Sequence, residues 1–150
     1  MEKSGTEKLP FLKVDQVGVV VKDIGKTIEH LASLGIGPFE PAHSTPIIER
    51  EVRGKPGDYE LKIRFAQLGQ VELELIQPVK GECIHKEFLE SKGEGIHHLG
   101  FFVDDIGKEI AKLTKQGIKI PQSGRRANGG GFAYLETDAV GGIVLELIQR

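Results

Sequence analysis

Four residues of types that bind divalent metals occupy two pairs of matching positions in this sequence. Gln16 and His98 are separated by 82 positions, and Glu74 and Glu146 by 72, within two repeated stretches. An imidazole nitrogen, two carboxylates and an amide oxygen form a borderline-to-hard ligand set that suits Zn²⁺, Co²⁺, Ni²⁺ or Mn²⁺. If the two halves of the chain face each other about a pseudo-two-fold axis, all four side chains meet. We therefore expect these four residues to hold one divalent metal ion.

Each residue also has an ordinary structural interpretation when it is taken alone. Glu146 lies between Val144 and Ile148 on one face of an expected strand, and at a sheet edge its carboxylate would simply reach solvent. Burying it without a partner would be costly, so the alternative is a metal or another charge. A histidine among apolar residues, such as His98, more often packs in a core. His97 should point to the opposite strand face, because successive side chains alternate.

The matching positions belong to an internal duplication. Residues 14–36 and 96–118 align without gaps, and ten of these 23 positions are identical. The segment LELIQ occurs at 73–77 and again at 145–149, in the same order relative to the first block. Repetition of two blocks in register indicates that one structural unit is present twice.

Each copy predicts a strand, a helix and then further strands. Residues 14–21 and 96–103 have the alternating apolar pattern of a strand. The apolar spacing then becomes helical, after Asp23 and Asp105 as N-caps and up to Gly35 and Gly117 as helix ends. Further strands are expected at 47–52, 59–67, 71–77, 118–120, 131–137 and 143–149, and a short linking helix at 84–90. This order indicates an α+β fold with a large, mostly antiparallel sheet.

Composition excludes several other classes of protein. The 150 residues include 20 Lys and Arg against 22 Asp and Glu, and a net charge of −2 argues against nucleic acid as a partner. No apolar run approaches the roughly 20 residues that span a bilayer, and the N-terminus lacks the apolar stretch of a signal peptide. Cys83 is the only cysteine, so an internal disulfide is impossible. A cytoplasmic protein without membrane or nucleic-acid partners is expected.

A basic segment near the C-terminus is a candidate for binding the substrate. Arg125 and Arg126 precede Asn128 and the glycines at 129–131, which predicts a flexible, positively charged loop. Arginine forks bind carboxylates and phosphates at two points, and glycines let the backbone approach an anion. The competing interpretation is a solvated turn with no ligand.

With these residues considered together, the chain resembles the vicinal oxygen chelate superfamily from Val14 to Gln149. Its most specific stretches, KGEGIHHL at 92–99 and VLEL at 144–147, are similar to those of methylmalonyl-CoA epimerases. The resemblance implies tandem βαβββ modules that form a curved sheet around one metal. It implies a first module at 13–80, a linking helix at 81–95 and a second module at 96–150, after an N-terminal extension at 1–12. The family's metal ligands match Gln16, Glu74, His98 and Glu146.

The sequence departs from the epimerase pattern at two places. Position 16 is ordinarily histidine in those enzymes, and the set Gln, Glu, His, Glu is instead similar to that of zinc-using glyoxalase I. The catalytic carboxylate that epimerases carry before the third strand matches only loosely, to Asp58 or Glu60. Glu146, at the edge of the metal site, is the third candidate for the catalytic base.

The resemblance implies a metal-dependent epimerase that removes the proton α to a thioester carbonyl, with methylmalonyl-CoA as the first expectation. Arg125 and Arg126 would then receive the anionic end of the acyl-CoA. The alternative is a lactoylglutathione lyase of the glyoxalase I type, which isomerises a thiol adduct of methylglyoxal. A third possibility from another class is a ligand-sequestering resistance protein without catalysis, although the complete ligand set weighs against it. The family also implies a homodimer.

Overall fold

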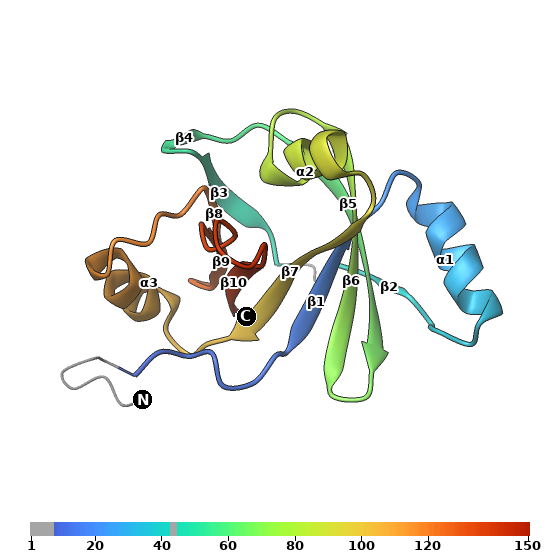
Figure 1. The fold of residues 1–150 in the computed structure, drawn as a ribbon, viewed down its shortest axis with the longest axis horizontal. Coiled ribbons are helices and arrows are strands. Elements are labelled where there is room, and N and C mark those ends of the chain that lie inside the picture. Colours follow the sequence, from blue (N-terminus) through green and yellow to red (C-terminus); the bar gives the residue numbers. More distant parts are fainter. Residues whose placement is uncertain (1–7, 43–44) are drawn as a thin grey trace.

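The computed structural model describes residues 8–42 and 45–150, which form three helices and ten strands in one curled sheet (Figure 1). The first half contains β1 (Gln16–Val20), α1 (Ile24–Ser33), β2 (Glu40–Pro41), β3 (Ile47–Val52), β4 (Lys55–Pro56), β5 (Glu60–Leu68) and β6 (Val71–Lys80). After α2 (Ile84–Lys92), the second half contains β7 (Gly95–Phe102), α3 (Ile106–Lys115), β8 (Gln122–Arg126), β9 (Gly131–Leu135) and β10 (Val144–Gln149). The α+β class expected from the duplication is confirmed.

The two copies meet at the centre of the sheet, within one chain. The strand order is β2-β5-β6-β1-β7-β10-β9-β8-β3-β4. Strands β1 and β7 pair antiparallel, and each has the last strand of its own copy, β6 or β10, as its parallel neighbour. The remaining pairs are antiparallel. Equivalent strands therefore flank a pseudo-two-fold axis between β1 and β7.

Helices α1 and α3 begin in the same way in both copies. The Asp23 carboxylate accepts a hydrogen bond from the backbone N–H of Lys26, and Asp105 does so from Lys108, each at 3.1 Å. These bonds satisfy N–H groups that the first helical turn leaves without partners. Each helix then covers one half of the sheet, α1 beside β6 and α3 beside β9 and β10 (Figure 1).

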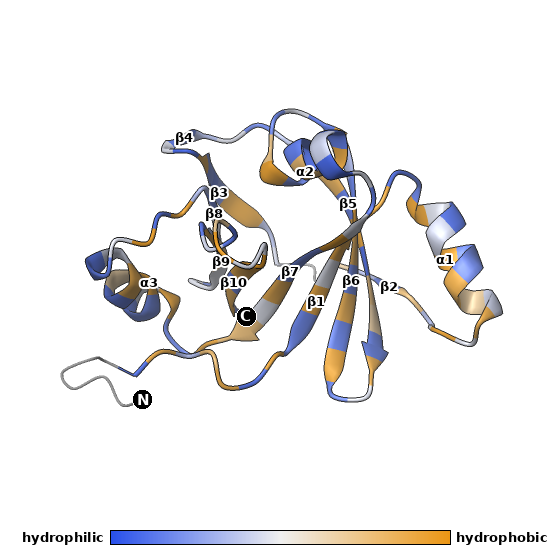
Figure 2. Ribbon diagram, viewed as in Figure 1, coloured by the Kyte–Doolittle hydropathy of each residue, from blue (hydrophilic) through white to orange (hydrophobic). Residues whose placement is uncertain are grey.

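Hydrophilic and hydrophobic residues alternate along β6 (Figure 2), and the sequence of β10 alternates in the same way. Leu73 and Leu75 belong to the hydrophobic cluster beneath α1, whereas Leu145 and Leu147 belong to the cluster beneath α3. Since successive strand residues face opposite sides, Glu74 and Glu146 point to the other face of the sheet. The same face of both copies is thereby left for a site.

One predicted strand is displaced. The expectation at 118–120 is wrong, because Ile118 and Ile120 pack in the cluster beneath α3 and the strand begins only at Gln122, after Pro121. Arg125 and Arg126 therefore lie on β8 instead of in a loop. Strand β8 pairs with β3 of the first copy, so the β3–β4 hairpin extends the sheet of the second copy.

The segment before β1 packs on the second half of the chain. Of the expected N-terminal extension at 1–12, the structure describes residues 8–12 and not residues 1–7. The Phe11 ring meets the Phe101 ring edge-on with centroids 5.0 Å apart, and Leu9 joins the cluster beneath α3. The linking helix is present as α2. No helix in the described residues has the length and apolar character needed to cross a membrane.

Candidate metal centre

Three of the four predicted ligands lie around the ring of the fourth, His98. His98 Nε2 lies 2.8 Å from Glu146 Oε2, 3.1 Å from Gln16 Oε1 and 3.3 Å from Glu74 Oε1. All four side chains are buried, and they come from β1, β6, β7 and β10. The central pairing of the two copies brings together residues that are up to 130 positions apart in the sequence.

The oxygen atoms that converge in this group are all hydrogen-bond acceptors, so a cation would satisfy them better than they can satisfy one another. Glu74 Oε1 and Glu146 Oε2 are buried and both face His98 Nε2, which carries at most one proton to donate to them. Gln16 Nε2 donates to Glu72 Oε1 at 2.8 Å, which turns Gln16 Oε1 inward. Two buried carboxylates need a positive charge between them. The Glu74–His98–Glu146 cluster, with its ligand atoms within 4.8 Å of one another, could hold a divalent metal ion.

Two glycines related by the duplication make room for two of these side chains. A Cβ atom on Gly18 would lie 1.9 Å from the His98 ring, and one on Gly100 would lie 2.9 Å from Gln16 Cβ. Each glycine therefore accommodates the candidate ligand of the opposite copy. This close approach explains why glycine stands at both equivalent positions.

The two neighbouring carboxylates favour a protonated His98 when no metal is bound. Burial lowers the pKa of His98, but Glu146 and Glu74 outweigh burial and raise it to about 10. Burial also raises the pKa of Glu146, against the opposing effect of His98. A divalent cation would take the place of that proton, because imidazole must be neutral to bind a metal.

His97 sits at a β-bulge and contacts His98 from the other side. Gly18 pairs with His98 and Val19 with Ile96, so His97 is the extra residue of β7. His97 lines a separate cavity, as the strand alternation predicts, but its Nδ1 lies 3.1 Å from His98 Nδ1. Burial lowers the pKa of His97 to about 3, so the ring is neutral at ordinary pH. A neutral partner on Nδ1 can fix the orientation of His98.

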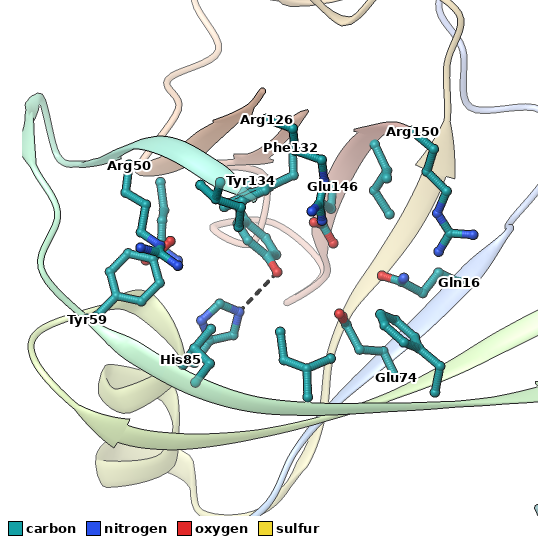
Figure 3. Close-up of a pocket in the computed structure, with 16 residues that line it drawn as sticks. Gln16, Arg50, Tyr59, Glu74, His85, Arg126, Phe132, Tyr134, Glu146 and Arg150 are labelled. Carbon is teal, nitrogen blue, oxygen red and sulfur yellow. Dashed lines mark hydrogen bonds between the residues drawn. The ribbon is translucent and has the colours of Figure 1, made fainter. Parts of the chain in front are cut away.

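A cavity of about 120 Å³ adjoins the candidate ligands and is lined by three arginines (Figure 3). Arg126 donates from Nη1 to the Thr45 carbonyl oxygen at 2.8 Å, and Arg150 donates to Glu72 at 2.6 Å. Arg50 stacks over Tyr59 on another side of the cavity. Apolar and aromatic side chains complete the walls, which suits an anionic organic ligand.

The structure separates the two predicted substrate-binding arginines. Arg126 lines the cavity, whereas Arg125 is exposed and pairs with Glu49 at 2.9 Å. The predicted catalytic carboxylates Asp58 and Glu60 are exposed and do not line the cavity. Tyr59, between them, is 6% exposed and does line it.

Sequence reasoning did not find several cavity residues. These residues are Arg50, Tyr59, His85, Gln122, Tyr134 and Arg150. No motif or spacing marks most of them. The Tyr134 hydroxyl lies 3.1 Å from His85 Nε2, and burial raises the pKa of Tyr134, so this hydroxyl keeps its proton beside Glu146.

Comparisons with known proteins agree with this architecture. The family model for the glyoxalase/bleomycin resistance protein/dioxygenase superfamily matches residues 15–134. The uncharacterized protein YqjC of Bacillus subtilis (strain 168) is 27% identical over 91% of both chains. Mitochondrial methylmalonyl-CoA epimerase of Bos taurus is 27% identical, over 91% of this chain and 74% of its own length. The crystal structure of methylmalonyl-CoA epimerase from Mycobacterium tuberculosis has a TM-score of 0.67 and 19% identity, with 98% of this chain and 93% of that chain covered.

The duplicated half-barrel, with a His and Glu cluster between its copies, defines a protein class built from paired βαβββ modules. The chain belongs to the glyoxalase/bleomycin resistance protein/dioxygenase superfamily, as the family match over most of its length establishes. The resemblance seen in the sequence is therefore confirmed.

Proposed function

We propose that this protein is a metal-dependent epimerase that removes and returns the proton α to the thioester carbonyl of an acyl-CoA, with methylmalonyl-CoA as the first candidate. The main support for this proposal is a buried group of candidate metal ligands beside a cavity that is lined by arginine side chains. The group consists of Gln16, Glu74, His98 and Glu146. The similarity of the chain to the Bos taurus methylmalonyl-CoA epimerase supports this substrate class.

The residues of the cavity suit the removal of a weakly acidic proton. Burial raises the pKa of Glu146, which makes this carboxylate a stronger base. The proton would move from the α-carbon to Glu146, and the electron pair of the broken C–H bond would delocalise onto the carbonyl oxygen. A bound divalent cation would stabilise the charge on that oxygen as a Lewis acid. Glu74, the counterpart of Glu146 in the other copy, could return a proton to the opposite face.

The alternative is isomerisation of a hemithioacetal by a glyoxalase I-type reaction. The glutamine at position 16 favours it, because the sequence resemblance connects the order Gln, Glu, His, Glu with zinc-using glyoxalase I. Both reactions begin with removal of a proton from a carbon next to a carbonyl group. They differ in the substrate that must enter the cavity.

The test is proton exchange in D₂O with protein reconstituted with Zn²⁺, Co²⁺, Ni²⁺ or Mn²⁺. We expect mass spectrometry to detect deuterium at the α-carbon of methylmalonyl-CoA faster than in a protein-free control. Glu146→Gln should reduce this exchange by a factor of 100 or more, in line with the size of general-base effects. A glutathione–methylglyoxal assay runs in parallel. Turnover of the hemithioacetal without α-exchange on methylmalonyl-CoA would overturn the proposal.

A further inference from the structure

The glutamine among the candidate ligands has partners of its own on the side away from His98. Gln16 Oε1 lies 3.1 Å from His98 Nε2, whereas Gln16 Nε2 donates to Glu72 Oε1 at 2.8 Å. The same oxygen of Glu72 accepts a hydrogen bond from Arg150 Nη2 at 2.6 Å. Gln16 and Arg150 lie on the same side of the cavity (Figure 3). A continuous series of hydrogen bonds therefore runs from the candidate metal centre through Glu72 to Arg150.

Glu72 determines which atom of the Gln16 amide faces the candidate metal centre. A side-chain amide has a carbonyl oxygen that accepts and an NH₂ group that donates, and only the oxygen can bind a cation. An ionised carboxylate accepts hydrogen bonds and donates none, so Glu72 bonds to Gln16 Nε2 and leaves Gln16 Oε1 to face His98. With the amide reversed, its NH₂ group would face the cation and its oxygen would face the Glu72 oxygen.

Arg150 holds the Glu72 carboxylate in place. The guanidinium carbon of Arg150 is 4.4 Å from the centre of the Phe102 ring and 6.0 Å from the centre of the Phe65 ring. These cation–π contacts hold the guanidinium group against side chains of β7 and β5. The Glu72 side chain is only 12% exposed and is paired with this group, so its carboxylate stays beside Gln16. Glu72 is not a member of the His and Glu cluster that could hold the ion, so it acts on Gln16 and not as a ligand.

The two copies differ at the position of this carboxylate. Gln16 of β1 pairs with Glu72 of β6, and the equivalent pair in the second copy is His98 of β7 with Val144 of β10. An imidazole has no oxygen end and nitrogen end to distinguish, and the His98 ring contacts His97 instead. Valine is therefore sufficient beside the histidine, whereas a carboxylate stands beside the glutamine. This difference between matching positions indicates that Glu72 serves the amide of Gln16.

We propose that Glu72, held by Arg150, is a positioning residue that makes Gln16 bind a divalent metal ion through its amide oxygen. This inference rests on the metal-dependent part of the proposed function and is independent of the substrate. The competing interpretation is that the Glu72–Arg150 ion pair only stabilises the end of β10. An ion pair of that kind would affect the stability of the fold, with no specific coupling between Glu72 and Gln16 in metal binding.

The experiment is a double-mutant cycle on the Zn²⁺ affinity of the full-length protein, measured by competition with a fluorescent chelator. Glu72→Leu should weaken Zn²⁺ binding by about 10- to 100-fold, the usual effect of removing a partner that orients a ligand. In the Gln16→Ala background the same change should alter the affinity by about twofold or less, because no amide is left to orient. A general effect of the Glu72 charge would act equally in both backgrounds. Equal losses, or an unchanged affinity in Gln16→Ala alone, would overturn the proposal.

Further variants separate positioning from folding. Glu72→Gln should keep most of the Zn²⁺ affinity, because the oxygen of the introduced amide can accept both hydrogen bonds. Glu49→Leu is the matched control, since Glu49 also pairs with an arginine, Arg125 at 2.9 Å, but at the surface, so the affinity should not change. Urea unfolding gives the stability of every variant. If Glu72→Leu fails to fold, Arg150→Gln with and without Gln16→Ala replaces it in the cycle and should show unequal losses of the same kind.

Failure of this proposal and failure of the proposed function give different results. Zn²⁺ affinity is measured without substrate, whereas proton exchange on methylmalonyl-CoA measures the reaction. Unequal losses in the cycle, together with no proton exchange in the unmodified protein, would keep the role of Glu72 and reject the epimerase. Equal losses in the cycle, together with normal proton exchange in the unmodified protein, would do the reverse.

Discussion

His97 and His98 are adjacent in the sequence, but only His98 faces the candidate ligands, whereas His97 lines a separate cavity. His98 Nε2 faces two carboxylates and an amide oxygen, while the Nδ1 atoms of the two rings lie 3.1 Å apart. A metal on His98 Nε2 would leave the proton on His98 Nδ1, which would donate to His97 Nδ1. His97 would therefore act through the orientation of His98.

These roles predict unequal losses of metal affinity. We expect His98→Ala to abolish tight binding of Zn²⁺, because it removes a ligand at the centre of the group. His97→Ala should weaken binding by about 10- to 100-fold, the usual effect of removing a partner of a ligating histidine. Competition with a fluorescent zinc chelator measures both affinities, and unmodified protein should bind about one equivalent. Equal losses in the two variants would contradict the assignment.

At the scale of the elements, strand β8 directs two arginines that are adjacent in the sequence into different surroundings. Arg126 lines the cavity, whereas Arg125 pairs with Glu49 at the surface. Arg126→Ala should raise KM for a CoA ester about tenfold or more, since a hydrogen bond from a charged group contributes about 1.5–3 kcal/mol. Arg125→Ala should change KM less than twofold. Steady-state kinetics of both variants, with metal content as a check, test this; a larger effect of Arg125→Ala would mean that the substrate lies outside the cavity.

The duplication predicts the elements that repeat and fails for those that do not. The strands that contain His98, Glu74 and Glu146 have apolar neighbours at alternate positions, so their faces can be read from the sequence. Strand β8 reads QSGRR and is held by backbone pairing to β3 and β9, which leaves no apolar pattern to detect. Tyr59 lines the cavity instead of Asp58 or Glu60 because it shares a face of the chain with Leu61, Ile63 and Phe65, which also line the cavity. This alternation can be read from the sequence, whereas the loose match to the family's catalytic carboxylate drew attention to the two residues beside it.

At the scale of the whole molecule, the site is complete within one chain. Strands β1 and β7 pair directly, so both copies contribute candidate ligands within one chain. The four candidate ligands therefore meet without the homodimer that the family resemblance implies. The same central pairing encloses three neighbouring histidines, of which His85 lines the cavity beside the carboxylates and His97 lines a second cavity.

The buried histidines make the stability of the whole fold depend on pH. Burial lowers the pKa of His97 to about 3 and lowers that of His85 well below its usual value. The unfolded chain therefore binds protons as pH falls below about 6.5, while the folded chain does not. Stability that is fully present above pH 6.5 is lost toward acid, by up to about 1.4 kcal/mol per pH unit for each histidine. His98 has a raised pKa, so the folded chain keeps this proton while the unfolded chain still gains one near pH 6.5. His98 therefore opposes the slope close to pH 6.5 and stops contributing at lower pH, where both states are protonated.

We expect the free energy of unfolding of chelator-treated protein to fall steadily from pH 6.5 to 5, above the range in which most carboxylates titrate. His97→Gln should lower the slope, because glutamine does not titrate, and His85→Gln should do the same. His30→Gln is the matched control, since His30 is exposed on α1 and should leave the slope unchanged. Urea unfolding followed by circular dichroism at several pH values gives these slopes. A slope that stays the same in both buried-site variants would mean that the two rings accept protons in the folded state, which is incompatible with their burial in a neutral cluster between β7 and α2.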